Sequence, residues 1–511
     1  MPEPYRVIDL FAGPGGLAEG FSSLRRPDGR PVFQLGLSIE KEPVAHRTLR
    51  LRGLFRLLRE HERAEPYYAY VKGELDWDSL RTECGDDFAA ADREAWNAEL
   101  GVTSHAEVRS RVVEALEGER HRWLLMGGPP CQAYSLVGRS RMRGRDPEAF
   151  AADHRHFLYR EYLRILAEHA PCAFVMENVK GLLSSRVNNE GTFQRILDDL
   201  ENPAASLGLE VQDASSYRLF ALSRGREPSV FHLPGEFVVR AEHHGVPQRR
   251  HRVIIIGIRR DLLTDGFALT PLSLQAEVPI EDVIDDLPRL RSGLSSEDDP
   301  GRWRAWVGGA LERLQATDDD NDMAAVVRET AIRFSADLAR GTEYSRVHVG
   351  PSYRPDWYTD PQFSGILNHA TRGHMAEDLE RYLFAACFAQ AKGRSPSLQH
   401  FPDRLLPDHE NVDRAIDRGL FNDRFRVQLY GQPATTITSH ISKDGHYYIH
   451  PDPTQCRSLT VREAARLQTF PDNYFFEGPR TSQYVQVGNA VPPLLAAEVA
   501  AVVRDALDAL V

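Results

Sequence analysis

Cysteine is scarce in this sequence: the 511 residues contain five, and no two of them form a Cys-x-x-C pair. So small and scattered a set excludes a disulfide framework and argues against structural zinc. The sequence also lacks an apolar run long enough to span a membrane. Its N-terminus, MPEPYRVIDLFAG, has no basic segment or cleavage site before the first apolar strand. We therefore expect no membrane association and a location in the cytoplasm.

An excess of positive charge is missing as well, because 62 Lys and Arg face 74 Asp and Glu, for a net charge of −12. This balance argues against a surface that binds nucleic acid all over, but not against a basic cleft on an acidic body. One basic stretch is VGRSRMRGRDP, with arginines at positions 139, 141, 143 and 145. It is either a solvated surface loop or an anion-binding loop, and its position just after Cys131 favours the second.

The length allows about two or three domains. Residues 1–270 alternate short apolar strands with helical stretches, which is typical of a parallel α/β sheet. Within them, 41–122 is mostly charged and helical and is interpreted as an insertion. Strand signals become irregular after residue 270, and acidic polar breaks appear. We therefore expect a separate mixed domain over 271–430 and a return to the first domain over 431–511. Strands are predicted at 5–13, 33–40, 122–128, 172–179 and 252–259, and a covering helix at 159–169.

A glycine-rich turn follows the first strand, in VIDLFAGPGGLAEGF. Gly13, Gly15 and Gly16 allow the backbone to approach a ligand closely at the start of a helix. The spacing is neither G-x-G-x-x-G nor that of a phosphate loop, so a ligand without a pyrophosphate fits better, such as an adenosine joined to an amino acid. Glu40 ends the next strand, where a carboxylate can accept both hydroxyls of a ribose.

A second turn, in LLMGGPPCQAYS, leads to a cysteine. Gly127 and Gly128 allow a sharp change of direction, and the two prolines that follow stiffen the exit. Cys131 would thus be held at the end of a strand. It is either a small buried apolar residue or a reactive thiol.

Two further stretches place polar groups at strand ends. FVMENVKGL has Glu177 and Asn178 at the end of an apolar strand, and because such ends meet at one edge of a parallel sheet, Asp9, Glu40, Cys131 and Glu177 are expected along one rim. The alternative is a solvated surface acid. GVPQRRHRVIIIG has Gln248, Arg250 and Arg252 two residues apart, so that in a strand they would point to one side. The alternative is an ordinary basic start of a strand.

Six stretches occur in the order seen in DNA cytosine-5 methyltransferases: DLFAGPGGL, GGPPCQAYS, ENV, QRRHR, RSLTVREAARLQTFP and QVGNAVPP. The chain strongly resembles this family from residue 9 to residue 493. The resemblance implies an α/β, Rossmann-like S-adenosylmethionine-dependent methyltransferase sheet. Residues 271–430 occupy the place of the family's variable target-recognition domain.

The resemblance also implies roles for residues in the reaction. Cys131 would add to carbon 6 of a flipped-out cytosine, which makes carbon 5 able to take a methyl group. Glu177 would supply a proton or strong hydrogen bond at N3, and Arg252 would stabilise charge near O2. Gln248 and Arg250 would order the site and the phosphates.

The cofactor implied is S-adenosylmethionine, lying over Phe11 and the glycine turn with Glu40 on its ribose. The expected cofactor contacts are Phe11, Gly13, Gly15, Gly16, Glu40, Glu74, Pro129 and Asn489. Of these, Glu74 in KGELD is taken to replace the aspartate of the family's Gly-Asp-Ile. The expected DNA contacts are Ser135, Arg139, Arg141 and Arg143.

The histidines at 369, 374, 440, 446 and 450 lack firm ligand spacing, and no metal site is expected. Thr460 and Glu463 have the spacing of a capping box at the start of a helix. The expected partner is duplex DNA, bound by a monomer, in a restriction–modification or phage-defence setting that includes a nuclease. Three alternatives stay open: a transfer RNA methyltransferase, a non-catalytic DNA-binding protein on the same fold, and a Rossmann oxidoreductase.

Overall fold

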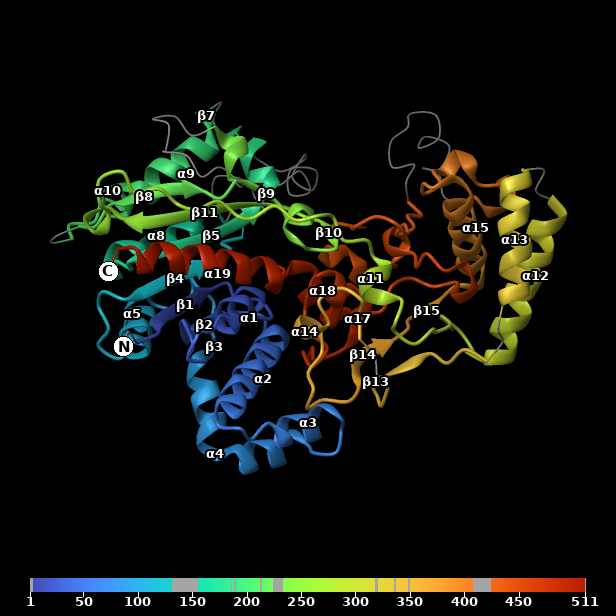
Figure 1. The fold of residues 1–511 in the computed structure, drawn as a ribbon, viewed down its shortest axis with the longest axis horizontal. Coiled ribbons are helices and arrows are strands. Elements are labelled where there is room, and N and C mark those ends of the chain that lie inside the picture. Colours follow the sequence, from blue (N-terminus) through green and yellow to red (C-terminus); the bar gives the residue numbers. More distant parts are fainter. Residues whose placement is uncertain are drawn as a thin grey trace.

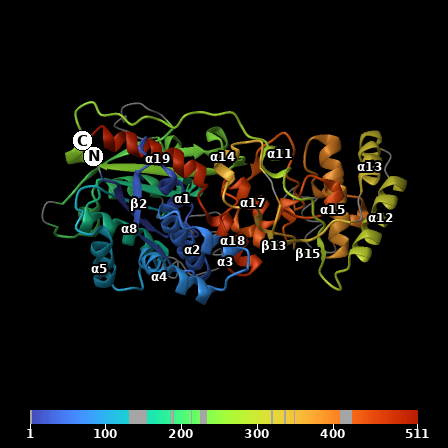
Figure 2. The ribbon, with the colours of Figure 1, turned by 60° about the horizontal axis from the view of Figure 1, so that its bottom comes forward.

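The computed structural model describes residues 3–130, 155–184, 186–187, 190–211, 214–223, 233–317, 320–334, 337–347, 350–407 and 424–510. The chain forms a sheet-centred part, which contains both ends of the described chain, and an elongated extension that ends in three helices (Figures 1 and 2). None of the helices in these ranges is both long and apolar enough to cross a membrane.

An eight-stranded sheet forms the centre of the first part, in the order β3-β2-β1-β4-β5-β11-β8, with β9 also paired to β11. Neighbours from β3 to β5 are parallel, whereas β11 runs antiparallel to β5, β8 and β9. The expected α/β sheet is thus confirmed, and it is mixed. Its strands are β1 (Tyr5–Leu10), β2 (Phe33–Glu40), β3 (Ala95–Asn97), β4 (Trp123–Gly127), β5 (Ala173–Val179), β8 (Tyr217–Ala221), β9 (Val238–Arg240) and β11 (His251–Arg259).

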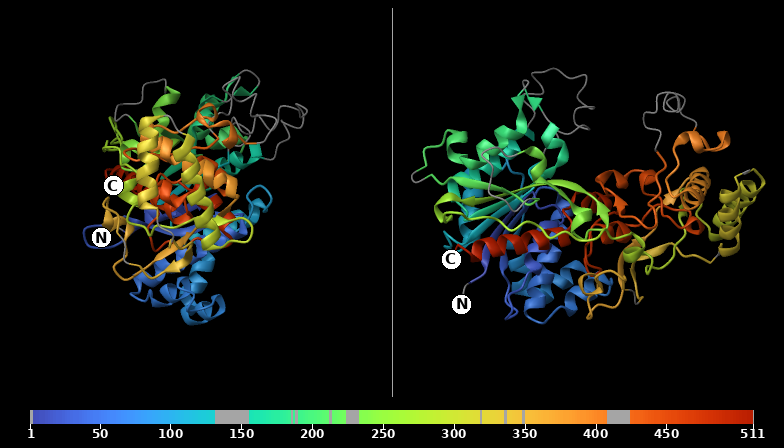
Figure 3. Two further views of the ribbon diagram at one scale, coloured as in Figure 1. Left: turned by 90° about the vertical axis from the view of Figure 1, so that its right-hand side faces the viewer. Right: turned by 45° about the horizontal axis from the view of Figure 1, so that its top comes forward.

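Helices cover both faces of this sheet (Figure 3). On one face, α1 (Gly16–Ser23) packs against α19 (Pro493–Asp508), whose first turn is set by Pro492 and Pro493. On the other face lie α5 (His105–Leu116), α8 (Arg155–His169) and α9 (Thr192–Glu201), with α10 (Pro203–Leu207) beside them. Two hydrophobic clusters result, one per face, and they fix the strand ends that carry the site.

Residues 41–122 are more than a helical insertion. α2 (Pro43–Glu60), α3 (Glu65–Val71) and α4 (Trp77–Glu94) form an arm beside the sheet (Figure 1), with its own hydrophobic cluster. The same segment also supplies β3, which pairs with β2, and α5, which covers the sheet. A strand of three residues is too short for a periodic signal, which is why the sequence did not predict it.

The packing also departs from the expected boundaries at residues 271 and 430. Val278 to Leu287, including α11 (Glu281–Ile284), share one hydrophobic cluster with residues 434–490. That cluster contains residues of α17 (Val461–Leu467) and α18 (Arg480–Asn489). From the intervening region it contains Tyr358 and Ile366, with Val347, Tyr353 and Trp357 packed against it. The extension therefore begins after α11, and its base is built from segments of both the expected second and third domains.

The outer end of the extension is a three-helix cluster of α12 (Pro300–Thr317), α13 (Asn321–Arg333) and α15 (Ala376–Lys392). Short elements join it to the base: β12 (Gly293–Leu294) with β15 (Gly373–His374), β13 (Gly341–Ser345) with β14 (Ile366–Ala370), and α14 (Pro355–Tyr358). Two strand pairs lie nearer the sheet: β10 (Gln248–Arg249) with β16 (Ala434–Thr435), and β6 (Arg186–Val187) with β7 (Glu190–Gly191).

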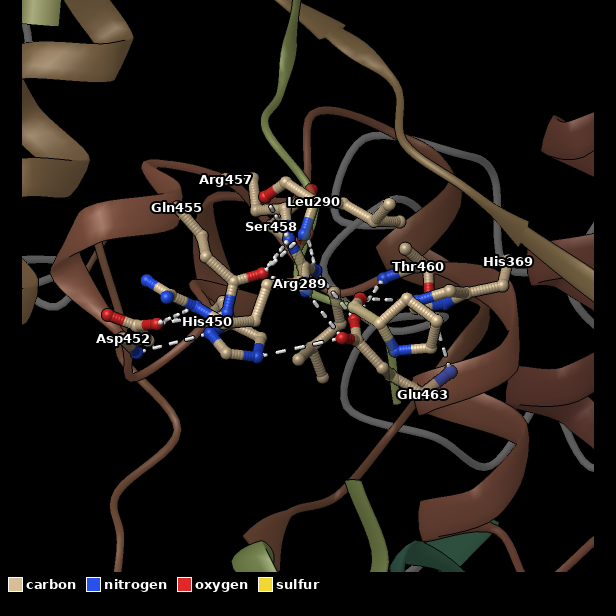
Figure 4. A network of polar contacts seen from close by, with 12 residues as sticks. Arg289, Leu290, His369, His450, Asp452, Gln455, Arg457, Ser458, Thr460 and Glu463 are labelled. Atoms are coloured by element: carbon tan, nitrogen blue, oxygen red, sulfur yellow. Dashed lines mark hydrogen bonds and ion pairs between the residues drawn. The ribbon is translucent and has the colours of Figure 1, made fainter. Parts of the chain in front are cut away.

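A buried polar network joins residues 289–290 and His369 to residues 450–463 (Figure 4). The Arg457 guanidinium donates to both carboxylate oxygens of Glu463, at 2.7 and 2.6 Å. Glu463 also accepts from the backbone N–H of Thr460 at 2.7 Å and closes the predicted capping box, which is confirmed. Burial alone would raise the pKa of Glu463, but the charge and hydrogen bonds of Arg457 outweigh it and hold that pKa well below its usual range.

Removing this carboxylate should destabilise the protein strongly. We expect Glu463→Gln to cost about 3 kcal/mol in urea unfolding near neutral pH, because it leaves the buried Arg457 charge without its partner. The difference in unfolding free energy between the wild type and the variant should shrink by about 1 kcal/mol as the pH falls from about 5.5 to about 3.5. Over that range the unfolded wild-type carboxyl takes up a proton, which the folded one does not, so the wild type loses stability. Glu329→Gln, in the exposed pair with Arg333, is the control and should change stability by less than about 0.5 kcal/mol. A deficit independent of pH would contradict this account.

Candidate active site

The glycine turn and Glu40 lie together, as predicted. The Gly13 N–H donates to Glu40 Oε2 and the Glu42 N–H to Glu40 Oε1, both at 2.8 Å. Gly15 has a φ of 96° where α1 begins, a backbone conformation that favours glycine. Burial raises the pKa of Glu40, although the backbone N–H groups oppose the rise. The carboxylate is thus held in a fixed position at the end of β2.

Space for a ligand lies over this turn. Among the described residues, and apart from its chain neighbours, no heavy atom lies within 4 Å of the position that a Cβ on Gly13 would take, and Phe11 nearby is only partly buried. Gly16 is different, because a Cβ there would lie 2.2 Å from the Val491 carbonyl oxygen. The QVGNAVPP segment therefore packs directly against the turn, and Asn489 stays exposed at the end of α18. An open turn beside a strand-end carboxylate fits an adenosine-bearing ligand.

Asp9 lies beneath the rim and not on it. Its side chain is fully buried in β1, and neither carboxylate oxygen accepts a hydrogen bond within the described chain. Burial, followed by the nearby charge of Glu40, raises the pKa of Asp9 well above its usual value. The expected rim of carboxyls is thus reduced, among residues that the structure describes, to Glu40 and Glu177.

Glu177 and Arg252 form an ion pair at the other end of the rim. Arg252 Nε lies 2.8 Å from Glu177 Oε1, and the two side chains are 12% and 14% exposed. They come from the antiparallel strands β11 and β5. A Cβ on Gly128 would lie 2.9 Å from Glu177 Oε2, and Asn178 Nδ2 donates to the Pro129 carbonyl at 3.0 Å. The carboxyl is therefore packed against the turn that leads to Cys131.

Cys131 itself lies outside the described residues. So do the four expected DNA contacts: Ser135, Arg139, Arg141 and Arg143. For these five positions the sequence-based predictions stand as they were made.

Gln248 and Arg250 do not share a face with Arg252 at the rim. The Arg250 guanidinium is buried and donates to the carbonyls of Ile437 (2.7 Å), Ala490 (2.8 Å) and Gly488 (3.2 Å). Gln248 Oε1 accepts from the Ile437 N–H, and its Nε2 donates to the Leu467 carbonyl. The pattern failed because β10 ends at Arg249 and β11 begins at His251. Two buried side chains of this kind can order the site through the backbone, but they cannot reach a phosphate.

Glu74 does not lie at the end of a strand. It is exposed in the turn between α3 and α4. The strand that follows β2 in the sheet is β3, and its last residue, Asn97, donates to the carbonyls of Glu40 (2.8 Å) and Lys41 (3.0 Å). Asn97, which the sequence analysis did not single out, therefore lies beside Glu40 at the same edge of the sheet, and only its place at the end of a three-residue strand could have indicated it.

Four of the five histidines singled out in the sequence have polar partners in the protein. His369 contacts Thr460 Oγ1 at 2.9 Å and the Pro288 carbonyl at 3.0 Å, and His446 contacts the Tyr382 hydroxyl at 2.7 Å. His450 approaches Glu463 at 3.5 Å, and His374 lies 3.2 Å from Ser458 Oγ. Within the described ranges, no group of three or more His, Cys, Asp or Glu side chains is arranged to hold a metal ion.

The sheet, the open glycine turn and the strand-end carboxylate together define a methyltransferase fold of the S-adenosylmethionine-dependent kind, as the sequence predicted. Comparison with known proteins makes the class more specific. The model of the C-5 cytosine-specific DNA methylase family matches residues 100–228 and 234–504. The chain therefore belongs to this family and is a DNA (cytosine-5-)-methyltransferase.

Relatives of full length support the assignment. The chain is 33% identical to the type II methyltransferase M.Bpa9945I of Bacillus paralicheniformis, over 98% of this chain and 99% of that protein. It is 27% identical to the DNA (cytosine-5-)-methyltransferase M.ApeKI of Aeropyrum pernix, over 99% of each chain. Among solved structures, a putative DNA modification methyltransferase encoded within an E. coli prophage aligns over 99% of each chain, with 18% identity and a TM-score of 0.51, which supports the fold.

The contact between the glycine turn and the QVGNAVPP segment can be tested. Gly16→Ala should destabilise the protein by about 2 kcal/mol in urea unfolding, because the new methyl group overlaps the Val491 backbone and one of the two segments must move. Gly308→Ala in α12 is the control: nothing lies within 4 Å of its Cβ position, so stability should stay the same or rise slightly. Equal effects of the two substitutions would show that the turn is not packed as described.

Proposed function

We propose that this enzyme transfers a methyl group from S-adenosylmethionine to carbon 5 of a cytosine in a specific duplex DNA sequence, through a transient bond between Cys131 Sγ and carbon 6. The observation that carries the proposal is the Glu177–Arg252 pair, packed against the Gly128–Pro129 backbone one residue before the Pro-Cys step. A carboxyl, a guanidinium and a thiol on one rim suit addition to a pyrimidine ring.

Carbon 5 of cytosine is a weak nucleophile, so the ring must be activated first. A thiolate adds to carbon 6 readily and leaves readily once the methylated ring loses its carbon 5 proton. The negative charge that the addition brings to the ring needs a proton or strong hydrogen bond at N3. Glu177 is assigned this role, because its Oε2 accepts no hydrogen bond from Arg252 and lies on the side of the turn.

Arg252 has two roles in this proposal. Its Nε pairs with Glu177 Oε1 and fixes the carboxyl. The positive guanidinium also stabilises the negative charge that develops near O2 of the base. Gln248 and Arg250 act behind it, by joining β10 and the start of β11 to residues 437 and 488–490. They are positioning residues and not catalytic ones.

When bound, S-adenosylmethionine supplies an electrophilic methyl group. The residues that would hold it are Glu40 at the ribose hydroxyls, Phe11 and the glycine turn, with Pro129 and Asn489 at the edges. A cytosine inside a duplex is out of reach of this rim, so the base must flip out, at a cost of a few kcal/mol. The basic stretch that contains Arg139, Arg141 and Arg143 is proposed to bind the phosphates and offset this cost.

Bisulfite sequencing of plasmid DNA from cells that express the protein tests the function directly. Methylated cytosines should recur in one DNA sequence motif. Transfer RNA from the same cells should gain no 5-methylcytosine relative to cells that do not express the protein. A partner nuclease would be expected to recognise the same motif, since relatives named as type II methyltransferases suggest a restriction–modification setting.

Cys131→Ser tests the covalent step. The variant should lose methylation and should fail to form a covalent complex with a duplex that carries 5-fluorocytosine at the target position, while it still binds S-adenosylhomocysteine. Cys84→Ser, in the helical arm, is the matched control and should form the complex as the wild type does. Trapping of Cys131→Ser at the wild-type level would remove Cys131 from the mechanism.

Glu177→Gln tests the carboxyl. It should lower kcat by about 10²–10⁴-fold, because an amide keeps the shape of the side chain but cannot deliver a proton to N3. The affinity for S-adenosylhomocysteine should change by less than about two-fold, since Glu40 and not Glu177 contacts the cofactor in this proposal. Glu99→Gln, in the exposed pair with Lys41, should leave both quantities unchanged. If the affinity for S-adenosylhomocysteine fell by the same factor as kcat, Glu177 would contact the cofactor and not the cytosine, and the proposed role would be refuted.

A further inference from the structure

The carbonyl group in the middle of the glycine turn is held from behind by one buried side chain. The Tyr474 hydroxyl donates a hydrogen bond to the Pro14 carbonyl, from a residue 460 positions away in the sequence. Tyr474 is 1% exposed, and burial raises the pKa of its hydroxyl, so the group remains a donor. Neither the family resemblance nor the reaction proposed above uses this contact.

Holding this carbonyl fixes the turn. In a trans peptide the C=O and the N–H point in opposite directions, so the Pro14 carbonyl and the Gly15 N–H are set together. The Gly15 N–H donates to the Ala12 carbonyl at 3.0 Å, and the Gly13 N–H donates to Glu40. The Tyr474 hydroxyl therefore helps to fix the backbone of the glycine turn. That backbone includes Gly13, which forms the open surface and donates to Glu40, the carboxylate proposed to bind the ribose.

Tyr474 is itself held by the helical arm. Arg52 in α2 lies over its ring, with the guanidinium carbon 4.6 Å from the ring centroid. The same guanidinium binds Glu19 in α1 and donates to Asn473 Oδ1 at 3.0 Å. Asn473 Nδ2 in turn donates to Asp360 Oδ2 at 2.7 Å. Through these buried polar contacts, Arg52 of the arm is connected to three places: α1, which follows the turn, Asn473 next to Tyr474, and Asp360 in the extension.

We propose that Tyr474, braced by Arg52, is a positioning residue that sets the shape of the glycine turn and with it the affinity for the methyl donor. It touches neither donor nor DNA. The proposal rests on the proposed function, in that the ligand of the turn is S-adenosylmethionine. It also gives the arm a role, which is to keep the ring of Tyr474 in place.

Calorimetric titration of the full-length protein with S-adenosylhomocysteine, without DNA, tests the proposal. Tyr474→Phe should weaken binding by up to about ten-fold, because without this hydrogen bond the turn adopts its binding-competent shape for only a fraction of the time. With DNA present, KM for S-adenosylmethionine should rise by a similar factor, whereas kcat at saturating donor should stay within about two-fold of the wild type.

Tyr217→Phe is the matched control. Tyr217 in β8 is equally buried and donates its hydroxyl to the Pro171 carbonyl at 3.1 Å, so its removal costs a comparable hydrogen bond that contacts neither the turn nor the arm. Thermal unfolding should shift by similar amounts in the two variants, but only Tyr474→Phe should lose affinity. Wild-type affinity in Tyr474→Phe, or an equal loss in both variants, overturns the proposal. A wild-type protein that fails to bind S-adenosylhomocysteine would instead refute the cofactor assignment under the proposed function.

Discussion

The buried Arg250 guanidinium ties together parts of the candidate active site that lie far apart in the sequence. It joins the segment between β10 and β11 to three backbone carbonyls contributed by residues 437, 488 and 490. These two regions are separated by roughly half of the chain. Gln248 makes a parallel connection to Ile437 and Leu467. Because the QVGNAVPP segment packs against the glycine turn, this joint helps to fix the position of that turn relative to the Glu177–Arg252 pair.

Buried charge is the general means by which this chain joins distant segments. In α17, Arg462 donates to the carbonyls of Leu367 and Pro471, and Arg466 pairs with Asp472. Both guanidinium groups are fully buried, as is that of Arg457. Such groups add little net stability over apolar packing, but each requires its partners in place, so they specify one arrangement of the segments. A methyltransferase whose rim is assembled from several parts of the chain needs that specificity.

Sequence motifs predicted the parts of the site that are local and failed where the structure is long-range. The glycine turn, Glu40 and the capping box of Thr460 each lie within one element or two adjacent ones, and their local spacing was sufficient. Arg250 looked like a strand residue, but a break in the strand and carbonyls more than 180 residues away decide its orientation. Glu74 was assigned by motif alone, because β3 is too short to show a period and Asn97 carries no motif. The packing of α11 on segments that follow residue 434 likewise has no local signal in the sequence.

The pairing of α1 with α19 affects how the protein is made. The apolar face of α1, with Leu17, Ala18 and Phe21, is covered by residues 495–507. At the usual pace of translation, about 5–20 residues per second, the cover emerges from the ribosome roughly half a minute to a minute and a half after the face that it protects. Until those residues emerge, the apolar face of α1 lacks its partner, so one of the last segments synthesised completes the packing of one of the first.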